Sequence, residues 1–283
     1  MLTRQTPAWL FVIALAAFLT LAKTAWCEDN WPQWRGPRGD GGSSESGLPI
    51  EWGEDKNVLW KVAIDGQGHS SPIIWGRQVF LTSSVEGDVV TGAKPVVHIE
   101  NGEVFLHPDS MGADRQHSFK VVSLDIETGE LLWEQSSYEG TVYDDRHRKS
   151  SYASPTPTTD GRLVYAYFGS QGVYAYDFEG HLVWKASFGG IATFGMGVGS
   201  SPILNGDLLI LQCDEDTGEK SFIIALDKNT GKEVWKVHRG VQASWSTPKL
   251  VETNGMTELV TSGKLLIRGD KSLYAIGVSS TGR

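Results

Sequence analysis

The 283-residue sequence contains only two cysteines, Cys27 and Cys213. Cys27 falls in an N-terminal segment that we expect to be removed, so Cys213 is predicted to be a lone thiol. This excludes an internal disulfide, and the fold must be held by its apolar core. Basic residues are also few: 25 Lys and Arg stand against 34 Asp and Glu, a formal net charge of −9. This balance argues against nucleic acid or an anionic membrane surface as the main partner.

Residues 1–27 have the three parts of a signal peptide. Arg4 supplies positive charge, residues 9–21 form an apolar core interrupted only by Thr20, and Ala25 and Cys27 take the small-residue positions before a cleavage site. We expect cleavage before Glu28 and export to the periplasm of a bacterium or to the extracellular space. The alternative is an uncleaved signal anchor. It would be the chain's attachment to a membrane, because no second apolar segment is long enough to cross a bilayer.

One sequence unit occurs three times. Residues 225–235 read as the end of a strand, a tight turn with an aspartate and a glycine, and a new strand that carries a tryptophan. Residues 123–133 repeat the unit, and residues 175–184 repeat it with one residue fewer. The closing tryptophans are 51 residues apart, and a period near this length is typical of a propeller. The predicted turn and docking residues are Asp125, Gly129, Trp133, Asp177, Trp184, Asp227, Gly231 and Trp235.

A second element precedes each unit. A serine or threonine is followed by proline, which is tolerated at the first residue of a strand. These prolines are Pro72, Pro157, Pro202 and Pro248. Each repeat then supplies four short antiparallel strands, so we predict an all-β fold: a β-propeller of four-stranded antiparallel blades over residues 57–283. About four blades are present, and the ring that they form is either complete or incomplete.

Two segments stand outside the regular repeat. Residues 28–56, rich in Gly, Pro and Ser, are predicted to form an extended arm. We expect the tryptophans of its start to pack on the outside of the β-domain, with a sugar-stacking site as the alternative. The first repeat is longer than the others by an insertion at about residues 84–117, where Asn101 and Gly102 predict a hairpin with a type I′ turn.

The ends of the repeat region are irregular. Residues 57–63 copy the tryptophan strand without its preceding turn, and the fourth repeat has neither the aspartate turn nor the tryptophan. We therefore predict that the fourth blade lacks its last strand. Residues 57–63 could pair with residues 264–277 and close the ring. Alternatively, repeats are missing near residues 261–264 and the ring stays open, which is the arrangement we favour.

These residues resemble the pyrroloquinoline-quinone-like β-propeller repeat family, in whose docking motif a tryptophan packs between neighbouring blades. The segment TrpProGlnTrpArgGlyPro at residues 31–37 is similar to the start of a secreted bacterial subgroup. The family's rings usually hold seven or eight blades. The resemblance implies either a scaffold, as in the outer-membrane protein assembly machinery, or a quinone-dependent dehydrogenase. Its alcohol-oxidising branch stacks the cofactor on adjacent cysteines, which this sequence lacks.

Two loops carry candidate chemistry. Asp214, Asp216 and Glu219 offer a weak calcium-like spacing, and a solvated loop is the alternative. Residues 144–152 join the first blade to the second, and His69 holds the equivalent position before the first blade. We predict that these residues face one mouth of the channel and bind an anion or a carboxylate partner; pairing within the loop to Asp144 and Asp145 is the alternative. The predicted mouth residues are His69, Arg146, His147, Arg148 and Lys149.

These observations lead to one functional prediction and one alternative. We expect a non-catalytic exported propeller that serves as a protein- or ligand-binding scaffold, with no cofactor and no catalytic residues. The alternative is a quinone-dependent oxidoreductase of the alcohol or sugar dehydrogenase type, with pyrroloquinoline quinone and Ca²⁺.

Overall fold

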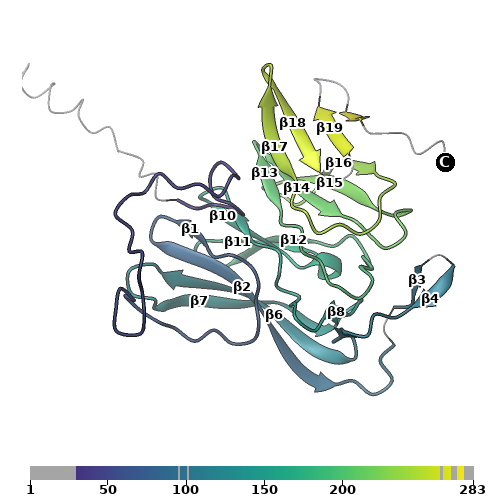
Figure 1. The fold of residues 1–283 in the computed structure, drawn as a ribbon, viewed down its shortest axis with the longest axis horizontal. Helices are drawn as coiled ribbons and strands as arrows, with labels where there is room; N and C mark the ends of the chain where they lie inside the picture. Colours follow the sequence, from purple (N-terminus) through teal and green to yellow (C-terminus); the bar gives the residue numbers. More distant parts are fainter. Residues whose placement is uncertain (1–29, 95, 101, 262–263, 269–272, 277–283) are drawn as a thin grey trace, which may run out of the picture.

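The protein forms four four-stranded antiparallel sheets that follow one another along the chain (Figure 1). The computed structural model describes residues 30–94, 96–100, 102–261, 264–268 and 273–276; the predicted signal peptide lies outside them. No helix among these residues has both the length and the apolar character to cross a membrane. The first sheet contains β1 (Ile73–Trp75), β2 (Gln78–Val89), β6 (Arg115–Asp125) and β7 (Leu131–Thr141), and the second contains β9 (Thr158–Thr159), β10 (Leu163–Tyr167), β11 (Val173–Asp177) and β12 (Leu182–Ala186). The third sheet contains β13 (Ile203–Asn205), β14 (Leu208–Cys213), β15 (Phe222–Asp227) and β16 (Glu233–His238). The fourth contains β17 (Lys249–Thr253), β18 (Met256–Thr261), β19 (Lys264–Arg268) and β20 (Leu273–Ile276).

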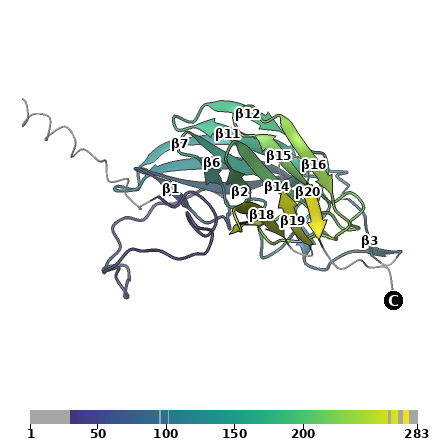
Figure 2. The same cartoon turned by 90° about the horizontal axis from the view of Figure 1, so that it is seen from above.

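The four sheets have the order and packing of propeller blades. Each is a meander whose strand order follows the sequence, and β9 contacts both β1 and β13, so the first strands lie side by side at the inner end. The last strands β7, β12 and β16 lie along one edge of the molecule (Figure 2). Burial follows this arrangement. β15 buries five of its six residues because sheets cover both its faces, whereas β16 turns only Trp235 and Val237 inward.

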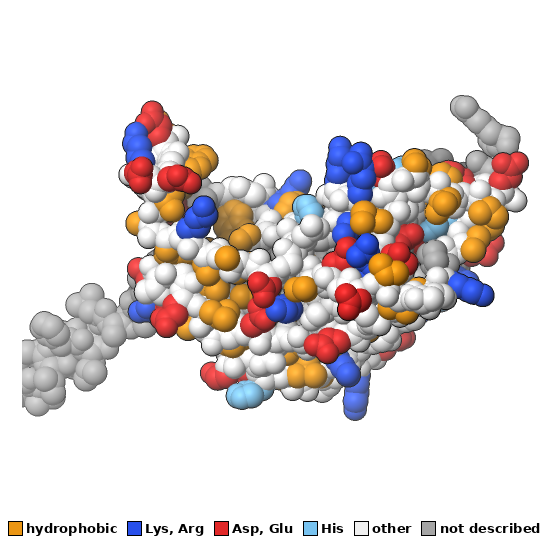
Figure 3. All heavy atoms as spheres, turned by 90° about the horizontal axis from the view of Figure 1, so that it is seen from below, with side chains coloured by type: hydrophobic (Ala, Val, Ile, Leu, Met, Phe, Trp, Pro, Cys, Tyr) orange, Lys and Arg blue, Asp and Glu red, His pale blue; other side chains and the backbone are white. Residues whose placement is uncertain are grey.

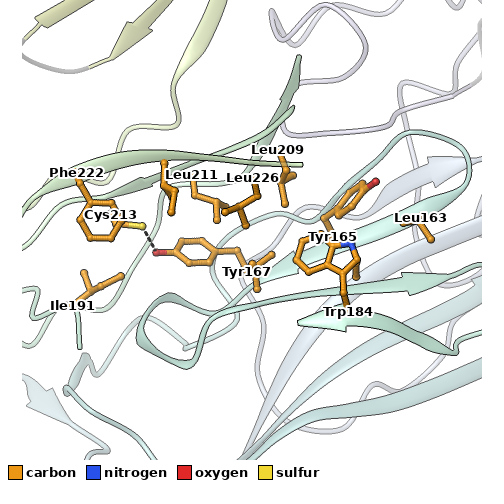
Figure 4. Packing of buried hydrophobic residues seen from close by; sticks show 13 residues of the cluster. Leu163, Tyr165, Tyr167, Trp184, Ile191, Leu209, Leu211, Cys213, Phe222 and Leu226 are labelled. Carbon is orange, nitrogen blue, oxygen red and sulfur yellow. Dashed lines mark hydrogen bonds between the residues drawn. The ribbon is translucent and has the colours of Figure 1, made fainter. Parts of the chain in front are cut away.

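The core between the second and third sheets is largely aromatic and aliphatic (Figure 4). Tyr165 and Tyr167 of β10 are buried with Leu209 and Leu211 of β14. The Tyr167 hydroxyl and the Cys213 thiol form a hydrogen bond of 3.3 Å inside this core. Burial raises the pKa of the Cys213 thiol to about 12, although the bond to Tyr167 acts in the opposite direction. Cys213 is therefore an inert core residue.

The repeat tryptophans join consecutive sheets. Trp133 Nε1 donates to the Phe178 carbonyl at 2.8 Å, and Trp184 Nε1 donates to the Lys228 carbonyl at 2.9 Å. Each indole thus lies on the aspartate turn of the following repeat. A Cβ atom built on Gly231 would come within 2.4 Å of the Trp184 ring, and Gly231 has φ +70°. Glycine is required there both for the backbone conformation and for the close approach of the ring.

The aspartate turns are built alike. Asp125 Oδ1 accepts the backbone N–H groups of Glu127 and Thr128, at 2.9 and 3.0 Å. Asp227 Oδ1 does the same for Asn229 and Thr230, at 3.0 and 2.9 Å. In the shorter turn, Asp177 Oδ1 accepts from the N–H groups of Glu179 and His181, at 3.1 and 2.8 Å. The aspartate therefore fixes the turn on which the preceding tryptophan rests.

The tryptophans at the two ends differ. Trp60 Nε1 donates to the Ile126 carbonyl at 2.8 Å and its ring lies on Gly129, just as in the other joints. Residues 57–63 nevertheless form no strand in the structure, which corrects our prediction: the indole docks, but no neighbouring strand pairs with this segment among the described residues. At the other end Trp235 Nε1 is buried and finds no hydrogen-bond partner in the part of the chain that the structure describes.

A second joint lies at the inner strands. The residue before each entering proline donates its backbone N–H to the hydroxyl of the equivalent residue in the next repeat. The bonds run from Ser71 to Thr156 at 3.0 Å, from Thr156 to Ser201 at 2.9 Å, and from Ser201 to Thr247 at 3.0 Å. The sequence alone offers a reason for the proline but none for the serine or threonine before it. The structure supplies that reason, because the hydroxyl group links one sheet to the next.

The fourth sheet has four strands, so the prediction that it lacks its last strand is wrong. Thr261 of β18 pairs with Lys264 of β19, and β19 pairs with β20, so the two following apolar segments are successive strands of this sheet. β20 pairs with β19, and no strand pair joins it to residues 57–63 within the described ranges. Closure of the ring through these two segments, the less favoured of the two alternatives, is therefore not formed among the described residues.

The insertion in the first sheet is shorter than predicted. Ser84–Val89 still belongs to β2 and Arg115–His117 to β6, so only residues 90–114 leave the sheet. β3 (His98–Glu100) and β4 (Glu103–Phe105) pair as the expected hairpin, and Gly102 has φ +83°. β5 (Ser110–Met111) returns to pair with β8 (Arg146–His147).

The N-terminal arm is attached to two sheets. Trp31 exchanges two backbone hydrogen bonds of 2.9 Å with Ile74 of β1, and the Pro32 carbonyl accepts from the N–H of Thr159 in β9 at 2.9 Å. The arm therefore links the inner strands of the first two sheets before it turns at residues 33–36.

Candidate functional site

The insertion hairpin is held to the loops between sheets by one buried histidine. His98 Nε2 lies 3.0 Å from Asp144 Oδ1, and His98 Nδ1 lies 2.5 Å from Asp216 Oδ2. All three side chains are buried. Asp144 comes from the loop after the first sheet and Asp216 from the loop between β14 and β15. The histidine thus ties together three segments that are far apart in the sequence.

The electrostatics favour the charged histidine. Burial lowers the pKa of His98, but the hydrogen bonds and the charges of Asp144 and Asp216 outweigh it and raise the pKa to about 10. His98 is therefore an imidazolium between two carboxylates at neutral pH. A charge this well buried is tolerated only when paired in this way.

The glycine-rich loop before the third sheet completes the cluster. Asp144 Oδ2 accepts from the Thr193 N–H at 2.6 Å and from its hydroxyl at 3.0 Å, and Asp216 Oδ1 accepts from the Phe194 N–H. Phe194 has φ +53° and meets Phe105 of β4 edge-on, with ring centroids 5.8 Å apart. The hairpin is thus fixed by one ionic and one aromatic contact.

The predicted mouth residues differ in burial and in their partners. Arg146 is buried, with Nη2 3.1 Å from Glu86 Oε2 and its guanidinium 5.8 Å from the Tyr152 ring centre. Arg148 pairs with Asp109 at 2.6 Å, and Lys149 is exposed. His69 contacts the end of the same loop, with Nδ1 3.2 Å from Ser151 Oγ. Arg146 and Arg148 are thus already paired with carboxylates of the chain, and anion binding by these five residues stays a prediction.

One group in the described residues has the spacing of a metal site. The ligand atoms of His107, Asp109 and His147 lie within 4.8 Å of one another. However, both rings accept a backbone N–H at Nδ1, from Asp109 and Lys149, each at 3.1 Å. The ring protons then lie on Nε2, and Arg148 already holds one Asp109 oxygen at 2.6 Å. The group is a hydrogen-bond network around the Arg148–Asp109 ion pair rather than an open ligand set.

The acidic loop after β14 is mostly turned inward. Asp214, Glu215 and Asp216 are buried, and only Glu219 of the three predicted ligands is exposed. Burial raises the pKa of Asp214 to about 6, partly offset by Arg239, whose Nε lies 3.3 Å from its Oδ1. Asp214 and Asp216 are paired with Arg239 and His98, and the three predicted ligands form no group of metal-ligating side chains among the described residues.

Sequence reasoning missed His98 and the exposed outer face of the hairpin. Val97, Ile99, Val104 and Leu106 are between 44% and 73% exposed, while the opposite face carries His98 and Phe105 inward. Hydrophobic side chains are visible beside acidic ones at the right-hand end of Figure 3, where the hairpin lies. The signal in the sequence was a histidine at a position that alternates with aliphatic residues.

Four consecutive antiparallel sheets, joined by docked tryptophans, define a β-propeller built from repeats of the pyrroloquinoline-quinone-like type. The model of the family described as outer membrane protein assembly factor BamB matches residues 43–237 and, in an overlapping match, residues 117–282. The chain belongs to this family. No curated protein matches it.

Solved structures of this fold are similar to the chain at low identity. BamB from Moraxella catarrhalis is 17% identical over 74% of this chain and 60% of its own, with a TM-score of 0.35. The quinohemoprotein alcohol dehydrogenase ADHIIG from Pseudomonas putida HK5 is 13% identical over 73% of this chain and 29% of its own, with a TM-score of 0.42. A europium-containing methanol dehydrogenase is 15% identical over 60% of this chain, with a TM-score of 0.36. The chain spans only 25% of the methanol dehydrogenase.

Proposed function

We propose that this chain is a non-catalytic, exported propeller that binds another protein, and that the hairpin β3–β4 makes the contact. The observation that carries the proposal is the exposed aliphatic face of a hairpin whose other face is anchored by His98. An apolar patch that is held rigidly is the usual basis of a protein interaction site. Export is supported by the signal-like residues 1–27.

The chemistry of the hairpin defines the partner. β3 and β4 form a two-stranded sheet that no third strand extends among the described residues, and Ile99 lies directly opposite Val104. At the tip, Glu100 lies directly opposite Glu103, and two like charges in this position repel each other. We therefore propose an extended partner segment with alternating aliphatic residues and a Lys or Arg next to the tip.

The alternative function, a quinone-dependent alcohol or sugar dehydrogenase, fits the residues less well. The cysteine that could face a quinone, Cys213, is buried between sheets against Tyr167. The carboxylates that could ligate Ca²⁺, Asp214 and Asp216, are turned to Arg239 and His98. The described residues thus supply neither a cysteine pair nor a free carboxylate set for that cofactor.

Site-specific photo-crosslinking in the periplasm tests the proposal. A photoreactive residue at position 104 is compared with one at Val183, an exposed valine of β12 outside the hairpin. We expect an adduct from position 104 alone, mapped by mass spectrometry to an extended partner segment with a neighbouring basic residue. Stoichiometric binding of pyrroloquinoline quinone and Ca²⁺, with dye reduction by an alcohol or a sugar, would overturn the non-catalytic assignment.

A further inference from the structure

A cavity of about 440 Å³ lies between the N-terminal arm and the inner ends of the sheets. The entering segments of the second, third and fourth sheets line it with Thr156, Ser201 and Thr247, and the arm closes it with Trp34 and Arg35. His69 and Trp245 complete the wall. None of the residues of the hairpin β3–β4 lines this cavity, so it is separate from the protein-binding surface proposed above.

The hydroxyl groups of this cavity are prepared to donate. The hydroxyl oxygens of Thr156, Ser201 and Thr247 each accept a backbone N–H from the preceding sheet. No hydrogen bond donated by these three hydroxyls is present in the described part of the chain, so their O–H hydrogens are left for a ligand. Three donors around one space favour a ligand rich in oxygen acceptors.

Two tryptophans supply flat apolar surface. Trp245 Nε1 donates to the Gly197 carbonyl at 2.7 Å, which fixes the indole while leaving the residue 46% exposed. Trp34 of the arm is 38% exposed. Rigid aromatic faces next to polar donors are typical of sites that hold a ring with both C–H and oxygen groups.

The charge around the cavity is positive, in contrast to the chain's net charge of −9. Arg35 supplies the charge, and no Asp or Glu lines the cavity. An adjoining cavity of about 260 Å³ shares Trp34, Arg35 and Thr247 and is also free of lining carboxylates. It adds Lys249 and Arg38, of which Arg38 pairs with Asp40 at 3.0 Å.

We propose that this cavity binds an anionic saccharide, a pyranose ring that carries a carboxylate or a sulfate group. The C–H face of the ring packs on Trp245 or Trp34, the hydroxyl groups donate to ring and glycosidic oxygens, and Arg35 pairs with the anionic substituent. A flat aromatic acid would use the tryptophans and Arg35 but would leave the three inner hydroxyls without acceptors. The arrangement therefore favours a sugar.

Isothermal titration calorimetry on the full mature chain tests this proposal with three probes: trigalacturonate, a sulfated galactose trisaccharide and neutral galactotriose. We expect binding of at least one anionic probe and at least tenfold weaker binding of the neutral one, since a hydrogen bond to a charged group is worth about a factor of ten. The carboxylate and sulfate arms show which substituent the site prefers.

Matched variants locate the site. Arg35→Gln is expected to weaken the anionic probe about tenfold and to remove its advantage over the neutral one, whereas Lys185→Gln, on the exposed strand β12, leaves binding unchanged. Trp34→Ala is expected to weaken binding, and Trp52→Ala, an exposed arm tryptophan outside the cavity, is not. Thermal melting checks that each variant is folded.

Three outcomes overturn the inference: equal affinity for neutral and anionic probes, no effect of Arg35→Gln in a folded protein, or no binding of any probe. These outcomes leave the crosslinking test of the hairpin untouched. Conversely, the saccharide site stands if the hairpin gives no adduct. The failure of one proposal is therefore distinguishable from the failure of the other.

Discussion

The indole of Trp184 rests on Gly231 of the next repeat, with Nε1 2.9 Å from the Lys228 carbonyl. Trp184 and Gly231 belong to different repeats, so this contact contributes to the packing of one sheet against the next. A side chain at position 231 must push the ring away, because a Cβ atom would approach the Trp184 Cε3 to 2.4 Å.

Gly231→Ala is therefore expected to destabilise the protein more than Gly206→Ala. Both glycines have positive φ, +70° and +57°, but a Cβ at position 206 meets nothing within 4 Å. Gly206→Ala should cost only the backbone strain, about 1–2 kcal/mol, and Gly231→Ala this amount plus the displaced indole. The free energy of unfolding in urea checks the difference. Equal losses would show that the ring does not need its place on the glycine.

The three repeat tryptophans are expected to respond differently to removal of the indole N–H. Trp133→Phe and Trp184→Phe each lose a hydrogen bond to a neighbouring sheet and should cost about 0.5–1.5 kcal/mol beyond the change in packing. Trp235 has no acceptor in the described structure, so Trp235→Phe should lack this cost. Trp133→Ala, which also removes the ring, should cost about 3–5 kcal/mol. The same loss of unfolding free energy in urea for all three Phe variants would contradict the difference in hydrogen bonding between Trp235 and the other two tryptophans.

The ion pairs of His98 with Asp144 and Asp216 are expected to make the stability of the fold depend on pH. Its pKa is raised from 6.5 to about 10, so its contribution is fully present below pH 6.5 and is lost as the pH rises toward 10. His98→Gln should lower the melting temperature at pH 6, and the difference from the unmodified protein should shrink as the pH approaches 10. His238→Gln, at an exposed histidine of β16, serves as the control. If the difference in melting temperature between His98→Gln and the unmodified protein stays constant over this pH range, His98 is not held as a charged imidazolium.

The Cys213 thiol is expected to resist alkylation in the folded protein. It is buried, and its pKa of about 12 leaves almost no thiolate at pH 8. Iodoacetamide should label the peptide that contains Cys213 only after unfolding in denaturant, as followed by mass spectrometry. Rapid labelling of the native chain would place the thiol at an accessible surface instead of in the core.

Residues 59–62 are expected to exchange their amide hydrogens quickly. Leu59 is 91% exposed and the segment belongs to no strand, whereas β15 is a buried inner strand of its four-stranded sheet. Hydrogen exchange of the monomer at low concentration should show fast exchange at residues 59–62 and slow exchange at residues 222–226. Strong protection of residues 59–62 would mean that they pair with a strand and that the ring closes.

Local chemistry explains what could be predicted from the sequence. Asp227 and Gly231 shape one turn within five residues, so the blades and their order follow from short patterns. Long-range contacts could not be predicted in this way. The turn on which a tryptophan packs lies in the next repeat, and His98 and Asp216 are 118 residues apart in the sequence, so no short sequence pattern contains both partners. Arg146 was expected at an open mouth, but Glu86 and Tyr152 bury it from distant segments. The candidate site was missed because the folded-back insertion creates it.

The hydroxyl bonds from Ser71 to Thr156, Thr156 to Ser201 and Ser201 to Thr247 are chemically the same joint used three times. Each lies next to a proline that directly precedes the first strand of a sheet, so the recurring Ser/Thr-Pro element of the sequence marks the boundary of the structural unit. Unequal recombination at these prolines would add or delete a whole sheet while every remaining interface kept its donor and its acceptor. The number of blades can thus change in a single evolutionary step, without compensating substitutions at the inner joints.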